Sequence, residues 1–297
     1  MDIRGVLALV VLLSLAGCGS LAETDSRDPF TVNRTATTTA AGDSSGGDEG
    51  IVVSLDSDRN RIGDPATLVG AQERFLDGTS YRVRAVDRVT TANGTILREL
   101  IRDGAYAKNR TRYRYVETVR GENVDSPGRT VLFADGDRVY RRQTVANRTT
   151  TTLLRDDGGS PFAPSDMGVF RGEQTETLSL AFEAMTVTSV ETLESVPRGM
   201  EYPVYRLQST TLASPDRLAP TADTTVENAT LDVIVDAKGQ VRELVFRYTL
   251  LEDGERRVVT NRLAYMALGT TTVDRPTWTE NATDASSQTT ARSLRNR

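Results

Sequence analysis

The sequence predicts a mainly antiparallel β fold with a small helical part, an α+β domain. Most segments between residues 81 and 268 alternate apolar with polar side chains, and turn residues separate these segments. That pattern is typical of antiparallel strands with one buried and one solvated face. Strands and helices do not follow one another in βαβ order, which argues against a parallel doubly wound sheet.

A short helix is expected at the start of the domain. Asp64 is a suitable N-cap, Pro65 suits the first helical position, and Gly78 ends the helix. Leu68 and Phe75 fall on its apolar side. The helix therefore has one face to bury against the strands that follow.

Six strands are expected after this helix, at residues 81–89, 95–102, 112–116, 130–134, 138–145 and 149–154. Asn93-Gly94 predicts a two-residue hairpin turn, because both residues tolerate a positive φ. In the third strand, arginines alternate with Tyr113 and Tyr115. This alternation fits either a ligand-facing stripe of cations and rings or plain sheet packing, and we favour the packing interpretation.

A second helix is expected at residues 175–185, in the middle of the chain. Leu178, Ala181, Phe182 and Met185 recur there at helical spacing and form one apolar stripe. Five further strands are expected at residues 187–193, 202–211, 229–235, 241–251 and 256–268. Short turns join the last three of them into a meander.

The N-terminus has the features of a lipoprotein precursor. Residues 1–17 contain one arginine and an apolar run of signal-peptide length, too short for a comfortable membrane span. The stretch Leu15-Ala16-Gly17-Cys18 looks like a lipobox, in which the cysteine is lipidated and becomes the mature N-terminus. An ordinary secretory signal with a chance cysteine is the alternative. We therefore expect Cys18, the single cysteine of the chain, to anchor the protein to the extracytoplasmic face of the cell membrane.

Polar segments flank the domain on both sides. Residues 18–57 are rich in Thr, Ser, Gly and Asp and are expected to form a flexible tether, and residues 279–297 a disordered tail. The folded domain is expected at residues 58–278. Six Asn-X-Thr sequons fit an extracellular setting and are candidate N-glycosylation sites: Asn33, Asn93, Asn109, Asn147, Asn228 and Asn281.

Composition excludes several classes of function. The chain has no histidine, so histidine-based triads and metal sites cannot form, and the expected lipidation consumes the one thiol. We expect no enzyme activity, no metal and no cofactor. A net charge of −5 argues against nucleic-acid binding. Abundant arginine with only two lysines resembles proteins of salt-loving archaea, although a GC-rich genome gives much of the same bias.

The order of these parts resembles a known group of lipoproteins. A lipobox, tether and helix precede "GTSYRVRA", hairpins with "FADGDRVYRR", a mid-chain helix, "YPVYRLQST", "LDVIVDAKGQVRELVFRYTL" and "RPTW". This order is similar to haloarchaeal lipoproteins of uncharacterised role and to the LolA-like and LppX/LprG-like lipoproteins. The resemblance implies a curved, incomplete β-barrel, a half-barrel, with two or more helices across its concave side.

The resemblance also implies binding of acyl chains or lipidated clients, although fold alone does not establish function. We therefore expect a lipid or another apolar ligand in the half-barrel, held at the cell surface. Five apolar residues are the candidate lining of this ligand cavity: Phe75, Leu178, Phe182, Leu244 and Phe246. The alternative is a non-catalytic scaffold or partner-binding lipoprotein whose own side chains fill the same space.

Overall fold

The structure is a computed structural model of the 297-residue chain. It describes residues 55–56, 61–62, 65–108, 110–155, 160, 172–197, 200 and 203–284. The expected signal peptide, Cys18 and most of the expected tether lie outside the described residues, as do residues 285–297 of the expected tail.

One large sheet of 12 strands dominates the fold. From one edge to the other its strands are β10 (Ser189–Leu193), β11 (Val204–Ser209), β13 (Thr225–Asp236), β14 (Val241–Glu252), β15 (Glu255–Met266), β3 (Tyr81–Thr91), β4 (Ile96–Tyr106), β5 (Arg112–Arg120), β6 (Gly128–Asp135), β7 (Arg138–Val145), β8 (Arg148–Leu153) and β16 (Thr283–Asp284). Every neighbouring pair is antiparallel except β16 and β8. The predicted antiparallel fold class is confirmed.

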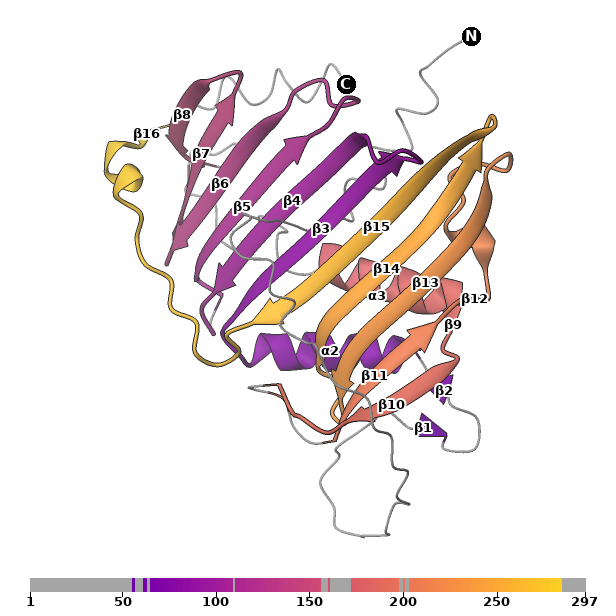
Figure 1. The fold of residues 1–297 in the computed structure, drawn as a ribbon. Coiled ribbons are helices and arrows are strands. Elements are labelled where there is room, and N and C mark those ends of the chain that lie inside the picture. The colour runs from indigo at the N-terminus through magenta and orange to yellow at the C-terminus, as the bar shows by residue number, and fades with distance from the viewer. Residues whose placement is uncertain are drawn as a thin grey trace, which may run out of the picture.

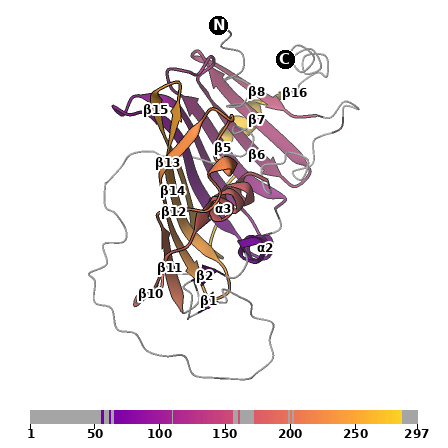
Figure 2. The same cartoon turned by 90° about the vertical axis from the view of Figure 1, so that its right-hand side faces the viewer.

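Two meanders make up this sheet. Strands β3 to β8 form one meander, and β10, β11 and β13 to β15 form the other. They are joined where β15 pairs with β3, for example at Val259 opposite Val89. The joined sheet is strongly curved and open, and two helices lie in its concave side (Figures 1 and 2). This arrangement is the predicted half-barrel.

The two helices lie at the predicted positions. Helix α2 (Pro65–Asp77) begins at the predicted proline, and helix α3 (Gly172–Ala184) carries the first three residues of the predicted apolar stripe, whereas Met185, the fourth, begins a short strand. Leu178, Ala181 and Phe182 of α3 are at most 4% exposed. The other elements are short: β1 (Leu55–Asp56), β2 (Arg61–Ile62), β9 (Met185–Thr186), β12 (Thr211–Leu212) and the 3-10 turns η2 (Pro215–Arg217) and η3 (Thr277–Asn281).

A single large core fills most of the space between the helices and the sheet. Three tyrosines close one end of it, with the ring of Tyr81 packed 4.9 Å from Tyr106 and 5.8 Å from Tyr265. Tyr113 and Tyr115 are also buried in this core, whereas Arg114 between them is exposed. The alternation in β5 is therefore plain sheet packing, the interpretation that we favoured.

Two further details differ from the sequence-based expectations. The loop at Asn93-Gly94 is longer than a two-residue turn, because Thr91 and Thr95 form the closing backbone hydrogen bond and Gly94 alone has a positive φ. The ordered elements also continue past the expected boundary at Trp278, to Asp284 at the end of β16. Trp278 packs there on a small cluster that contains Phe133. This contact explains why the chain stays on the sheet beyond that point.

Candidate functional site

The five residues predicted to line a cavity lie in or against the main core. Leu178, Leu244 and Phe246 are 0% exposed, Phe182 is buried, and Phe75 packs against them from α2 while half-buried. The fold thus brings all five together on the concave side. They fill that space with their own side chains, and none of them lines the cavity described next. Their role in contacting a ligand stays a prediction.

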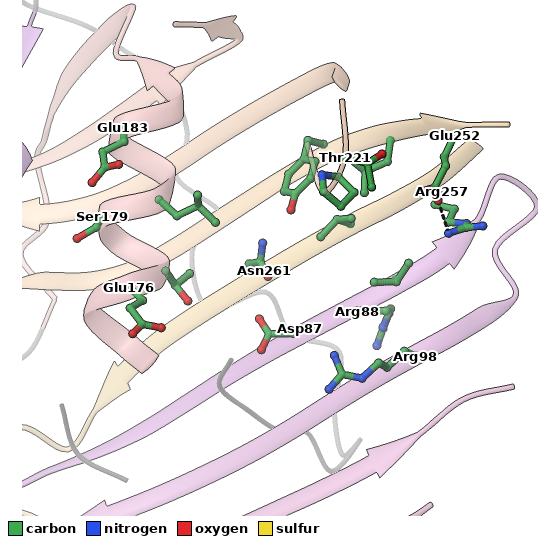
Figure 3. Close-up of a pocket in the computed structure, with 17 residues that line it drawn as sticks. Asp87, Arg88, Arg98, Glu176, Ser179, Glu183, Thr221, Glu252, Arg257 and Asn261 are labelled. Atoms are coloured by element: carbon green, nitrogen blue, oxygen red, sulfur yellow. Dashed lines mark hydrogen bonds and ion pairs between the residues drawn. The ribbon is translucent and has the colours of Figure 1, made fainter. Parts of the chain in front are cut away.

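A cavity of about 350 Å³ remains beside α3, next to this filled core. Its wall comes from α3, from β3, β4, β14 and β15, and from the turn at Pro220 and Thr221. Figure 3 shows side chains from α3 on one side of this space and from the strands on the other. The volume lies within the range of about 300–1,000 Å³ that small-molecule sites occupy. We call this space the α3 pocket.

Pairing between four strands places an apolar row on the floor of the α3 pocket. Tyr248 lies opposite Val259, Val259 opposite Val89, and Val89 opposite Arg98. All four line the pocket. Neighbouring strands are about 4.8 Å apart, so the row is about 14 Å long. It runs from an aromatic ring over two valines to a guanidinium.

The neighbouring cross-strand row, on the side of the main core, carries polar side chains at the pocket. Asn261 lies opposite Asp87, and both side chains contribute to the lining (Figure 3). Asp87 interrupts an inward-facing series on β3 that otherwise consists of the apolar or aromatic residues Tyr81, Val83, Ala85 and Val89. Burial raises the pKa of the Tyr248 hydroxyl well above its usual value, and the negative charge of Asp87 raises it further. The hydroxyl is therefore neutral at any ordinary pH.

Helix α3 forms the opposite wall. Leu180 is half-buried and faces the pocket with Thr177 and Glu183, from the side of the helix next to the buried stripe. Glu183 forms an ion pair of 2.7 Å with Arg217 of η2. Glu176, about two turns before Glu183, is exposed. The helix therefore offers an apolar contact at its centre and carboxylates toward solvent.

Two of the three arginines in the lining are engaged with carboxylates. Arg88 Nε donates to Glu99 at 2.6 Å, and Arg257 Nη1 donates to Glu252 at 2.8 Å. Arg98 makes neither a hydrogen bond nor an ion pair within the part of the chain that the structure describes. Burial lowers the pKa of Arg98 below its ordinary value, whereas the negative charge of Asp87 raises the pKa and offsets part of this effect.

The lining of the α3 pocket has the make-up of a ligand-binding site. The lining combines an apolar floor with a few polar groups, which is the usual make-up of a ligand pocket. Across the described residues, no group of three or more Cys, Asp and Glu side chains could hold a metal ion. The same residues include no helix long and apolar enough to cross a membrane.

Modification sites can be located in part. Asn93, Asn147, Asn228 and Asn281 are exposed, and Asn147 and Asn228 have positive φ. Asn33, Asn109 and the lipobox cysteine Cys18 lie outside the described residues. These four asparagines are therefore open to solvent in the folded domain.

Comparisons with known proteins place the chain in a family. A model for a family of unknown function, DUF7537, matches residues 4–282. The chain belongs to this family. No curated protein matches it. The chain is also similar to a DUF1329 family protein from Desulfovibrio piger of known crystal structure, with 11% identity over 69% of this chain and 92% of that one. The TM-score is 0.23, so no argument rests on this likeness.

Sequence reasoning missed the residues of the α3 pocket, although one signal was available. Inward-facing strand positions are expected to be apolar, and Asp87 and Arg98 are charged residues at such positions on neighbouring strands. A charge that interrupts the buried face of a strand marks either a buried ion pair or a polar site. Only the pairing register of β3 and β4 shows that Asp87 and Arg98 lie at the same pocket.

Proposed function

We propose that the protein is an exported lipoprotein, anchored through Cys18, whose half-barrel binds an amphiphilic or apolar ligand in the α3 pocket. The proposal includes a haloarchaeal source, a position on the outer face of the cell membrane, no catalytic activity, and use of exposed sequons for glycosylation. The single observation that carries the binding function is the cavity of about 350 Å³ beside α3 on the concave side of the sheet.

The energetics favour an apolar chain as the main contact. Val259 and Leu250 are 8% and 9% exposed, and Leu180 faces them from α3, so a chain in the pocket would be shielded from water. Each buried methylene contributes about 0.8 kcal/mol. A chain of several methylenes therefore offsets part of the cost of ordering the ligand on binding.

A scaffold function is the second candidate. It is favoured by the filled core, because Leu178, Phe182, Leu244 and Phe246 close most of the concave side with their own side chains. A scaffold needs no occupant in the α3 pocket. The two candidates therefore make different predictions for a variant with a blocked pocket: such a variant loses ligand binding if the protein is a carrier, and loses no function if it is a scaffold.

The test is saturable binding of a fluorescent alkyl-chain probe to the mature chain, residues 18–297, carrying Cys18→Ser so that no lipid is attached. Leu180→Trp should fill the pocket from α3 and abolish probe binding while the thermal midpoint stays close to that of the parent chain. Val196→Trp is the matched control, because Val196 is 39% exposed and does not line the pocket. Equal binding by all three proteins, or none by the parent, favours the scaffold.

A further inference from the structure

We infer that the ligand of the α3 pocket is a single-chain amphiphile with one negative headgroup, such as an alkyl carboxylate, and that Arg98 binds the headgroup. This inference rests on the proposed function and specifies its ligand class. The half-buried guanidinium of Arg98 at the end of the apolar row is the observation behind it.

Arg98 differs from its neighbours in having no partner among the described residues. Arg102, four positions along β4, is 4% exposed and donates to Glu117 at 3.0 Å. Tyr115 donates to the same carboxylate at 3.1 Å. The carboxylate of Glu117 is thus already engaged, and it acts on Arg98 only at longer range.

Asp87 is the other carboxylate near Arg98. Its charge acts on the guanidinium, but the two side chains form no direct ion pair in the described structure, and Asp87 has interactions of its own. A partly desolvated guanidinium without a direct partner is costly. A ligand carboxylate would supply that partner, because the five donors of arginine match two carboxylate oxygens at once.

The row on the pocket floor gives the orientation of the ligand. With the headgroup at Arg98, the chain would lie over Val89 and Val259 and end near the ring of Tyr248, a span of about 14 Å. The reverse orientation would place the headgroup beside the ring of Tyr248, whose hydroxyl is neutral, and would leave the charge of Arg98 without a direct partner. Charge therefore selects one of the two orientations.

Asn261 adds a second donor within the same lining. Its side chain lies on β15, two strands and one row away from Arg98 on β4, and makes no hydrogen bond within the described part of the chain. An amide donates through its nitrogen and accepts through its oxygen. It can therefore hydrogen-bond a polar group of the ligand elsewhere in the pocket without adding charge.

The experiment compares three probes of equal chain length on the mature Cys18→Ser chain: dodecanoate, dodecanol and dodecyltrimethylammonium. Calorimetric titration should rank dodecanoate first. Arg98→Gln should weaken dodecanoate binding by about tenfold or more and leave dodecanol unchanged, because only the charge-assisted contact is lost. Arg98→Lys should retain part of the preference.

Arg129→Gln is the matched control for net charge, since Arg129 is exposed on β6 and does not line the pocket. It should bind all three probes as the parent does. If dodecanol binds as well as dodecanoate and Arg98→Gln alters neither, the headgroup assignment is overturned while ligand binding stands. If none of the probes binds the parent chain, the proposed function and this inference fail together.

Discussion

Replacement of Phe182 by alanine tests whether α3 is fixed to the sheet, as the wall of the α3 pocket requires. Phe182 is 4% exposed and belongs to the main core, together with Leu178 of the same helix and Phe246 of the sheet. Truncation of a buried phenylalanine removes its apolar contacts and leaves a cavity that the surroundings fill only partly. The expected loss in free energy of unfolding is about 3–5 kcal/mol.

The loss can be expressed as a change in thermal midpoint. For a domain of about 150–250 residues, each kcal/mol lowers the midpoint by about 2–4 °C. Phe182→Ala should therefore melt about 6–20 °C below the parent protein when unfolding is followed by circular dichroism. The matched control is Glu176→Ala on the same helix, where the side chain is exposed and the expected change is within about 0.5 kcal/mol.

Equal midpoints for Phe182→Ala and the parent protein, within about a degree, would refute the reasoning. Such a result would mean that the ring is exposed in solution and that α3 does not pack on the sheet. The α3 pocket would then lose one wall. A large loss in Glu176→Ala as well would point to an effect on the helix itself rather than on its contact with the sheet.

Three further predictions concern other parts of the chain. Replacing Cys18 by serine should release the protein into the medium or leave an unprocessed precursor, and a processed variant that still fractionates with membranes would contradict the anchor. Glu99 is 0% exposed and forms ion pairs with two arginines, so Glu99→Gln should lower the free energy of unfolding by about 1.5–3 kcal/mol. Asp137→Asn, which removes one partner of an exposed ion pair, is the control and should change the free energy of unfolding by less than about 1 kcal/mol when both variants are measured by urea titration. Burial raises the pKa values of Tyr113 and Tyr248 in the folded state. Above about pH 10 these tyrosines ionise in the unfolded chain but stay neutral in the folded one, so the free energy of unfolding is unaffected below that pH and falls as the pH rises above it. Replacing both by phenylalanine should flatten that alkaline fall in unfolding free energy, and an unchanged pH profile would show that the hydroxyls are not buried.

Local patterns were sufficient to predict most elements of the fold. The proline at the start of α2 and the stripe on α3 gave both helices, and the alternation of residue types gave the long strands. These signals lie within a few residues of one another along the chain. The turn at Asn93-Gly94 was mispredicted, since the dipeptide fits a shorter loop than the one closed by Thr91 and Thr95.

The α3 pocket could not be predicted in the same way. It depends on the pairing of β15 with β3, which brings Val259 beside Val89 from positions about 170 residues apart, and no local pattern encodes that register. The predicted lining residues were correctly assigned to the inner side of the fold. Two of them, Leu244 and Phe246, lie nearer the middle of the sheet, where the helices cover them, and the remaining space lies farther along β14 at Tyr248 and Leu250.

Native mass spectrometry of the protein isolated from its own cells tests the binding function most directly. The account predicts a population with one added small mass, identified after organic extraction as a single-chain anionic amphiphile. Leu180→Trp should lose this added mass, whereas Val196→Trp should retain it. A protein that carries no added mass from its cells, together with no saturable uptake of dodecanoate by the purified chain, would contradict the account and favour a scaffold with a filled core.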